Sequence, residues 1–310
     1  MTGDDIGHAL ASLARGEEDD LLEFIPRFDE VVDLDGLRSR VSTHFIAHDA
    51  NSVPAVDMLA RSMARAAVDF CVPRDKIRSA QDELTRTGSS SAFVDLSAQA
   101  RELFVSAETS GEGGELLLFL LMERLMKLPQ ILSKMSLKTS SQMHVHGSDG
   151  VHARLGDDGI LDVFWGESKL YASSSSAFKE CIESIAPFLA AADDERKRDL
   201  LLIRDHLNVD QQQVAAHLIE YFDPSSAKRL KLRWNGVCLI GFDKDSYPNV
   251  SVLADKQREE LRTAITRWNA SIGARIIEHE LQEVNIDVFC LPVPSVKELR
   301  ASVLKALGAK

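Results

Sequence analysis

The chain has few of the features that mark secreted, disulfide-bonded or membrane proteins. Its 310 residues include only four cysteines, and no two of them form a CxxC pair. Each cysteine lies among apolar residues, so we expect reduced, buried thiols. No apolar run reaches the ~18 residues that cross a bilayer, and the chain starts with acids instead of a basic signal region. These absences predict a cytoplasmic protein with no membrane segment.

Basic residues are outnumbered by acidic ones, because 36 lysines and arginines stand against 48 aspartates and glutamates, which gives a formal net charge of −12. The surplus of acids is concentrated in residues 1–36, which hold eleven acids and two bases. The remaining chain is close to neutral, so it need not repel DNA, although it lacks the basic balance of a simple DNA-binding domain. The acidic segment is either solvated and partly mobile, or it covers a basic groove or docks a partner.

Hydrophobic periodicity and turn residues divide the chain into an acidic segment (1–36), a mainly helical region (37–107) and an α/β domain (108–310). We expect a strand at 285–291, a second hairpin at 231–242 with Asn235-Gly236 as its type I′ turn, and a helix at 295–307 that Ser295 caps. Further helices are predicted at 54–70, 93–105, 115–128, 256–280 and after the serines of 173–176.

The stretch GSDGVHARLGDDGILDVFWGESK, residues 147–169, reads as another β-hairpin. A three-residue loop ending in Gly159 places the glycine where a left-handed residue is needed. Arg154 then faces Asp162 across the strands, and the apolar residues of both strands share one face. The same register places Asp149 opposite Glu167, so the pairing that satisfies the apolar pattern also joins two acids.

Opposed strand residues have Cβ atoms ~5 Å apart, close enough for two carboxylates to hold one metal ion. Oxygen ligands of this kind suit Mg²⁺, with Mn²⁺ as a possible substitute. Lys169 lies two residues beyond Glu167 and therefore projects from the same face. An ammonium group there can orient a metal-bound water and offset charge on a phosphate.

Asp149 followed by Glu167-x-Lys169 resembles the active-site pattern of the PD-(D/E)xK nuclease superfamily, except that Ser148 stands where that pattern has proline. The wider context resembles the HamA family, effectors of the Hachiman anti-phage system, over roughly residues 35–305. It rests on GGELLLFLLMERLMKLPQILSKMSLKTS, MHVHGSDGVHA, GESKLY and the closing NIDVFCLPVPSVKELRASVLKAL.

This resemblance implies an α/β, restriction-endonuclease-like core, in which helices flank a mixed sheet, with a mainly helical N-terminal region. It implies a Mg²⁺-dependent DNA endonuclease whose catalytic residues are Asp149, Glu167 and Lys169. It also implies a partner, the superfamily 2 helicase HamB, which keeps the nuclease inactive until foreign or damaged DNA is met. The competing interpretation is a non-catalytic regulatory subunit that keeps the fold and binds a helicase or DNA.

Other residues have a functional and a structural interpretation. Glu115 is either a third metal ligand or an acid that stabilises a helix N-terminus, and Glu123 is a weaker candidate ligand. His144, His146 and His152 fit ordinary strand positions better than a zinc site. Basic residues that could bind DNA, or protect an exposed strand edge, are Lys134, Lys138, His146, Lys228, Arg229, Lys231 and Arg233.

Overall fold

A computed structural model describes residues 3–104, 111–133, 149–190 and 200–308. Its centre is a seven-stranded mixed sheet with the strand order β1-β2-β7-β6-β5-β4-β3. The strands are β1 (Arg27–Asp33), β2 (Arg40–His44), β3 (Gln130–Leu132), β4 (Gly150–Leu155), β5 (Leu161–Tyr171), β6 (Leu232–Asp243) and β7 (Asn285–Val293). Three strand pairs are parallel, namely β2–β7, β7–β6 and β6–β5. The pairs β1–β2, β5–β4 and β4–β3 on either side of them are antiparallel.

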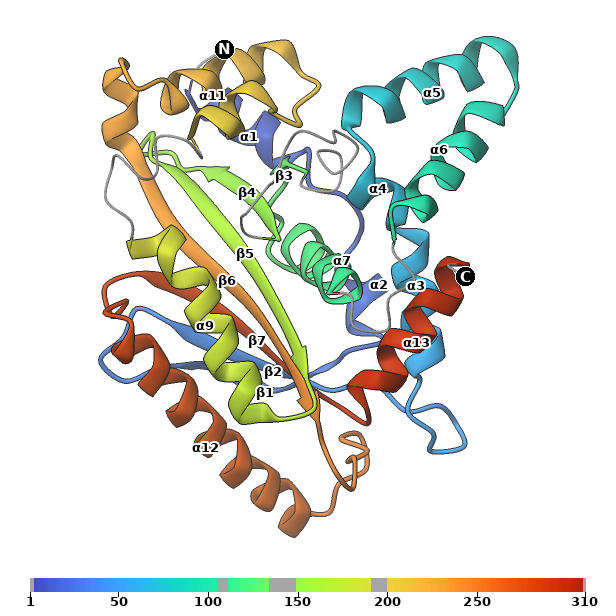
Figure 1. Cartoon of the computed structure of the whole chain (residues 1–310), viewed down its shortest axis with the longest axis vertical. Helices are drawn as coiled ribbons and strands as arrows, with labels where there is room; N and C mark the ends of the chain where they lie inside the picture. Colours follow the sequence, from blue (N-terminus) through green and yellow to red (C-terminus); the bar gives the residue numbers. More distant parts are fainter. Residues whose placement is uncertain (1–2, 105–110, 134–148, 191–199, 309–310) are drawn as a thin grey trace.

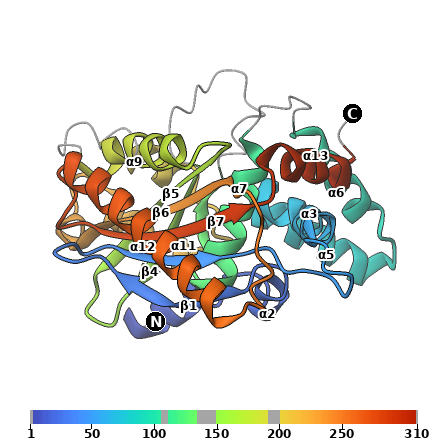
Figure 2. The same cartoon turned by 90° about the horizontal axis from the view of Figure 1, so that it is seen from below.

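Helices cover both faces of this sheet (Figures 1 and 2). The first face packs against α9 (Ser174–Ala190) and α12 (Asp255–Glu278), and the second packs against α3 (Val56–Arg65), α7 (Glu112–Leu120) and α13 (Val296–Leu307). Each face of the sheet has its own hydrophobic core, and alternate residues of β5 contribute to them. Val163 and Trp165 lie in the first core and Phe164 lies in the second. The predicted α/β class with a mixed sheet between helices is therefore confirmed.

The remaining helices lie around this sandwich. They are α1 (Gly3–Ala11), α2 (Asp19–Leu22), α4 (Ala67–Cys71), α5 (Arg74–Thr87), α6 (Ser91–Glu102) and α11 (Gln212–Phe222), with a 3₁₀ turn η2 (Ala227–Lys231) before β6. In Figure 1, α5 and α6 form an antiparallel pair that projects beside the sheet. None of the helices in the described part of the chain is long and apolar enough to cross a membrane.

Several local predictions are confirmed. The helix expected at 256–280 is α12, the strand expected at 285–291 is β7, and the serine-rich stretch begins α9. Ser295 caps α13, because its hydroxyl accepts a hydrogen bond from the backbone N–H of Glu298 at 3.2 Å. The helix expected at 115–128 begins at Glu112 and changes after Leu120 into a π-helical turn, η1 (Leu121–Leu125).

The second hairpin was predicted wrongly, because residues 232–243 form one continuous strand, β6, parallel to β5. Asn235 is only 2% exposed, and its side-chain amide donates to Asp162 Oδ1 at 3.2 Å. A Cβ on Gly236 would lie 3.0 Å from a methyl carbon of Leu189, so this glycine allows α9 to approach the strand. The Asn-Gly pair therefore serves interior packing and makes no turn.

The interpretation of the acidic segment as a solvated tail is also wrong for its apolar residues. Ile6, Leu10 and Leu13 are buried in the first core, while Leu21 and Ile25 are buried in the second. Strand β1 then leaves this segment and pairs with β2, which extends the sheet through its parallel pairing with β7. Both strands were missed because neither shows a clear alternation of polar and apolar residues.

Candidate active site

The β4–β5 hairpin has the predicted register. Arg154 pairs with Asp162, and the ladder continues to Gly150 opposite Gly166. Gly159 has a φ of 72°, the left-handed conformation that the three-residue loop requires. Asp149 follows at the end of the ladder, where its N–H donates to the carbonyl of Gly166 at 2.8 Å. Asp149 and Glu167 are therefore the next residues on the two strands beyond the last pair.

The carboxylate of Asp149 is held by its neighbour strand. Its Oδ2 atom accepts hydrogen bonds from both the backbone N–H and the hydroxyl of Ser168, each at 2.7 Å. Asp149 is 9% exposed and Ser168 is 7% exposed, so these bonds form in a largely dry environment, where they are stronger. Sequence reasoning missed Ser168, although a hydroxyl residue between Glu167 and Lys169 was the available signal.

Glu167 and Lys169 form an ion pair on the same strand. Lys169 Nζ lies 2.7 Å from Glu167 Oε1, and Glu167 is 5% exposed. Burial alone would lower the pKa of Lys169. The hydrogen bond to Glu167, with the charges of Glu167 and Asp149, outweighs burial and raises it. Lys169 therefore stays protonated at neutral pH and presents a cation beside the carboxylate of Glu167.

A comparison with known protein families identifies the family to which the chain belongs. A model of the HamA family matches residues 22–307, from α2 to the last turn of α13. The chain belongs to the HamA family. Membership supports a role as a Hachiman defence effector. No curated protein matched the chain.

Helix α7 brings Glu115 to the neighbourhood of this HamA-family site. A Cβ on Gly114 would lie 3.1 Å from Ser168 Oγ and 2.7 Å from Leu170 Cδ1, so the first turn of α7 packs directly on β5. However, no group of three or more His, Cys, Asp or Glu side chains in the described ranges could hold a metal ion. Glu115 does not join Asp149 and Glu167 in such a group here, and its role as a ligand stays a prediction.

Glu123 has a structural role, since it is completely buried at the centre of a polar cluster. Its Oε1 atom lies 3.0 Å from Arg15 Nη2 and 3.2 Å from Arg74 Nη2, and accepts the N–H of Gln130 at 2.9 Å. Its Oε2 atom accepts the N–H of Arg15 at 2.6 Å. His152 is buried beside this cluster, and its Nδ1 lies 2.8 Å from the carbonyl of Leu128, which fits a neutral strand histidine.

Three of the predicted DNA-binding residues, Lys134, Lys138 and His146, lie outside the described residues, as does His144. The other four surround the turn of the β4–β5 hairpin. Lys231 is exposed, with its Nζ near Gly159, and the nearby Lys228 pairs with Glu220 at 2.8 Å and lies over the ring of Tyr221. Arg229 lies between them in η2.

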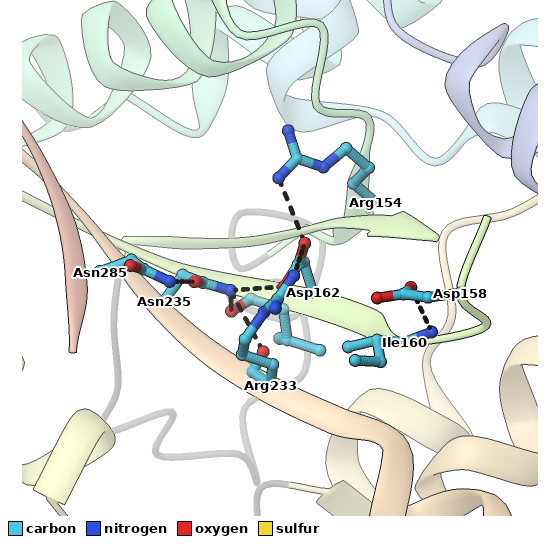
Figure 3. A network of polar contacts seen from close by, with 8 residues as sticks. Arg154, Asp158, Ile160, Asp162, Arg233, Asn235 and Asn285 are labelled. Carbon is cyan, nitrogen blue, oxygen red and sulfur yellow. Dashed lines mark hydrogen bonds and ion pairs between the residues drawn. The ribbon is translucent and has the colours of Figure 1, made fainter. Parts of the chain in front are cut away.

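Arg233 belongs to a network centred on Asp162, which is 2% exposed (Figure 3). Arg233 Nη2 donates to Asp162 Oδ2 at 2.9 Å, and Arg154 Nη2 donates to the same oxygen at 3.2 Å. The network continues through Asn235 to Asn285, whose amide donates at 3.0 Å. Five residue steps along β5 separate Asp162 from Glu167, which places this network about 17 Å from that acid.

Proposed function

We propose that this HamA-family chain is a metal-dependent DNA endonuclease of the PD-(D/E)xK type, kept inactive by a partner helicase until DNA activates the complex. The proposal is supported by the place of Asp149, Glu167 and Lys169 at one end of the β4–β5 hairpin, where Asp149 is bound by Ser168 and Lys169 pairs with Glu167. Two buried carboxylates and a partly buried ammonium are costly to a fold, and functional sites are where such groups gather.

The donor set fits a divalent cation. Asp149 and Glu167 offer carboxylate oxygens, the ligands that Mg²⁺ and Mn²⁺ prefer, and Mg²⁺ commonly uses only one or two protein carboxylates. A bound Mg²⁺ would lower the pKa of a water molecule and offset the charge of a phosphodiester. Asp149 and Glu167 would hold it, and Glu115 is proposed as a further ligand from α7.

The chain's own residues prepare this chemistry. Ser168 fixes the orientation of Asp149 through two hydrogen bonds, so the carboxylate needs little reorganisation. Lys169 stands beside Glu167 as a cation, where it can bind a phosphate oxygen and stabilise the negative charge that develops there during hydrolysis. DNA contacts are proposed for the basic residues around the hairpin turn, of which Lys231 and Arg233 are exposed.

The test is cleavage of supercoiled plasmid with Mg²⁺ by the wild type, Glu167→Ala and Lys169→Ala. We expect Glu167→Ala to reduce cleavage to background and Lys169→Ala to reduce it about 100-fold or more, with both variants folded. Lys179→Ala, an exposed lysine on α9, is the matched control and should cleave like the wild type. Near-normal nicking by either site variant would remove this mechanism.

Control by a helicase is tested with the partner that we propose, a superfamily 2 helicase encoded beside this chain. We expect the two proteins to co-purify, and the complex to leave intact plasmid uncut until ATP and a DNA end are present. The near-neutral body of the chain supports this, because a surface that neutralises few phosphates has only a modest DNA affinity at cellular salt, so delivery by a partner can dominate. Cleavage that is indifferent to helicase and ATP would favour a stand-alone nuclease.

A further inference from the structure

A groove at the β1 side of the sheet collects the acids of the N-terminal segment. It lies between α12 and the β1–β2 region and has a volume of about 680 Å³, in the range of ligand-binding cavities. Its walls are mainly apolar, with Phe28, Leu34 and Ile265 buried in them. Ile277 is 51% exposed and Val32 is 42% exposed, so apolar surface also reaches the rim. Exposed apolar surface of this kind is typical of binding sites.

The charge of the groove is one-sided. Glu30, Asp33 and Asp35 line it and are exposed. Asp29 also lines it but is neutralised by Arg262, whose Nε donates to it at 2.7 Å. Among the described residues that line the groove, Arg262 is the one basic residue. Part of the negative surplus of residues 1–36 is therefore concentrated along one wall of an apolar groove.

A buried polar atom points to an occupant. Asn269 lies on the groove-lining face of α12, is 7% exposed, and its Oδ1 atom has no hydrogen-bond partner in the described part of the chain. A buried carbonyl oxygen without a donor is unfavourable, and such groups call for an explanation. A segment that enters the groove with an N–H donor would satisfy this oxygen.

We propose that the groove binds a basic, partly apolar segment of the partner subunit, an inference that rests on the proposed helicase complex. The apolar walls would receive aliphatic side chains, the exposed acids would attract lysines or arginines, and Asn269 would accept an N–H. Strands β2, β7 and β6 separate β1 from β5, so a segment that binds in this groove does not itself lie on the strand that carries Glu167. Such a segment can thus stay bound while DNA enters the site.

The test measures the affinity of the full-length chain for the full-length helicase encoded beside it. Ile277→Glu places a charge on the apolar wall of the groove. The double variant Glu30→Lys/Asp33→Lys reverses the sign of two charges at the rim of the groove. We expect each to weaken binding at least tenfold and to retain the wild-type unfolding midpoint. The matched controls are Ile219→Glu on α11, where Ile219 is 39% exposed, and Glu83→Lys on α5. Both should bind within twofold of the wild type.

Asn269→Leu separates a binding role from a structural one. Leucine has a similar size and removes the unpartnered oxygen, so we expect an unchanged or higher unfolding midpoint together with about tenfold weaker helicase binding. A lower midpoint with unchanged binding would show that Asn269 only supports the fold, and would overturn its assignment to the groove.

Three further outcomes would overturn the proposal. If the groove variants bind the helicase like the wild type, the partner docks elsewhere, while the proposed complex and its control stand. If the wild-type chain does not bind the helicase at all, the proposed control and the groove proposal fall together, whereas plasmid cleavage still reports on the nuclease. Self-association that the groove variants abolish would assign the groove to a second copy of this chain instead.

Discussion

Replacing Glu123 with alanine should unfold the chain far more readily than replacing either acid of the site. Glu123 joins three segments that are distant in sequence, through Arg15, Arg74 and the N–H of Gln130. The two guanidinium groups are largely buried, with side-chain exposures of 16% and 9%. Burial lowers the pKa of Arg74 to about 10, which is still above pH 7, so its buried guanidinium is charged in the folded chain.

The size of the effect follows from this burial. Breaking a buried ion pair by removing one partner costs about 3–5 kcal/mol, because the remaining charge stays out of water. The unfolding entropy of a 310-residue chain, at about 2.1 cal/mol/K per residue, is roughly 0.65 kcal/mol/K near 60 °C. A loss of about 4 kcal/mol therefore corresponds to a decrease of about 6 °C in the unfolding midpoint.

Calorimetry and urea unfolding of Glu123→Ala and Glu123→Gln measure this loss. Glu123→Gln keeps the shape and one acceptor, so its loss should be smaller. Glu17→Ala is the control, because Glu17 is 86% exposed and lies 3.9 Å from Lys127, so it should change stability by less than about 0.5 kcal/mol. A decrease of less than about 1 kcal/mol in the free energy of unfolding of Glu123→Ala would refute the structural role of this residue. Arginines left buried without their carboxylate should destabilise the fold by more than that.

The remaining predictions concern positioning and pH. Ser168→Ala should leave the fold intact and reduce plasmid cleavage about tenfold, because Asp149 loses the bond from the hydroxyl and keeps the bond from the backbone N–H of residue 168. Unchanged cleavage would show that the hydroxyl has no positioning role. Gly114→Ala should reduce cleavage as well, since the added methyl would meet Leu170 and displace Ser168 Oγ; a fully active variant with an unaltered midpoint would contradict that close approach. Burial lowers the pKa of His44 to about 4 in the folded chain, whereas the unfolded value is about 6.5. The unfolded state thus binds more protons between these values, and stability should fall by roughly 3 kcal/mol for this histidine as the pH decreases from 6.5 to 4, measured by urea unfolding against His44→Gln.

Local features of the sequence were enough to predict the hairpin that carries the site. Alternation of apolar residues and a glycine at the left-handed position of the loop determine the register of β4 and β5, because a slip of one residue would turn every apolar side chain to the opposite face. The Ser295 cap of α13 and the long helix α12 follow from equally local signals. The hairpin, the helix cap and α12 each depend on residues that are close together in the sequence, so a single sequence is enough to predict them.

The tertiary structure decided the features whose cause lies far along the chain. Asn235-Gly236 has the sequence of a tight turn, but burial under α9 and the bond to Asp162 keep it inside a strand. Glu123 looks like a possible metal ligand until Arg15, 108 residues away, and Arg74, 49 residues away, meet it in the interior. A single sequence does not show which distant residues come into contact. The partner of each buried group is selected only when the whole chain folds, because distant segments then pack together and a buried charge that stays unpaired is costly.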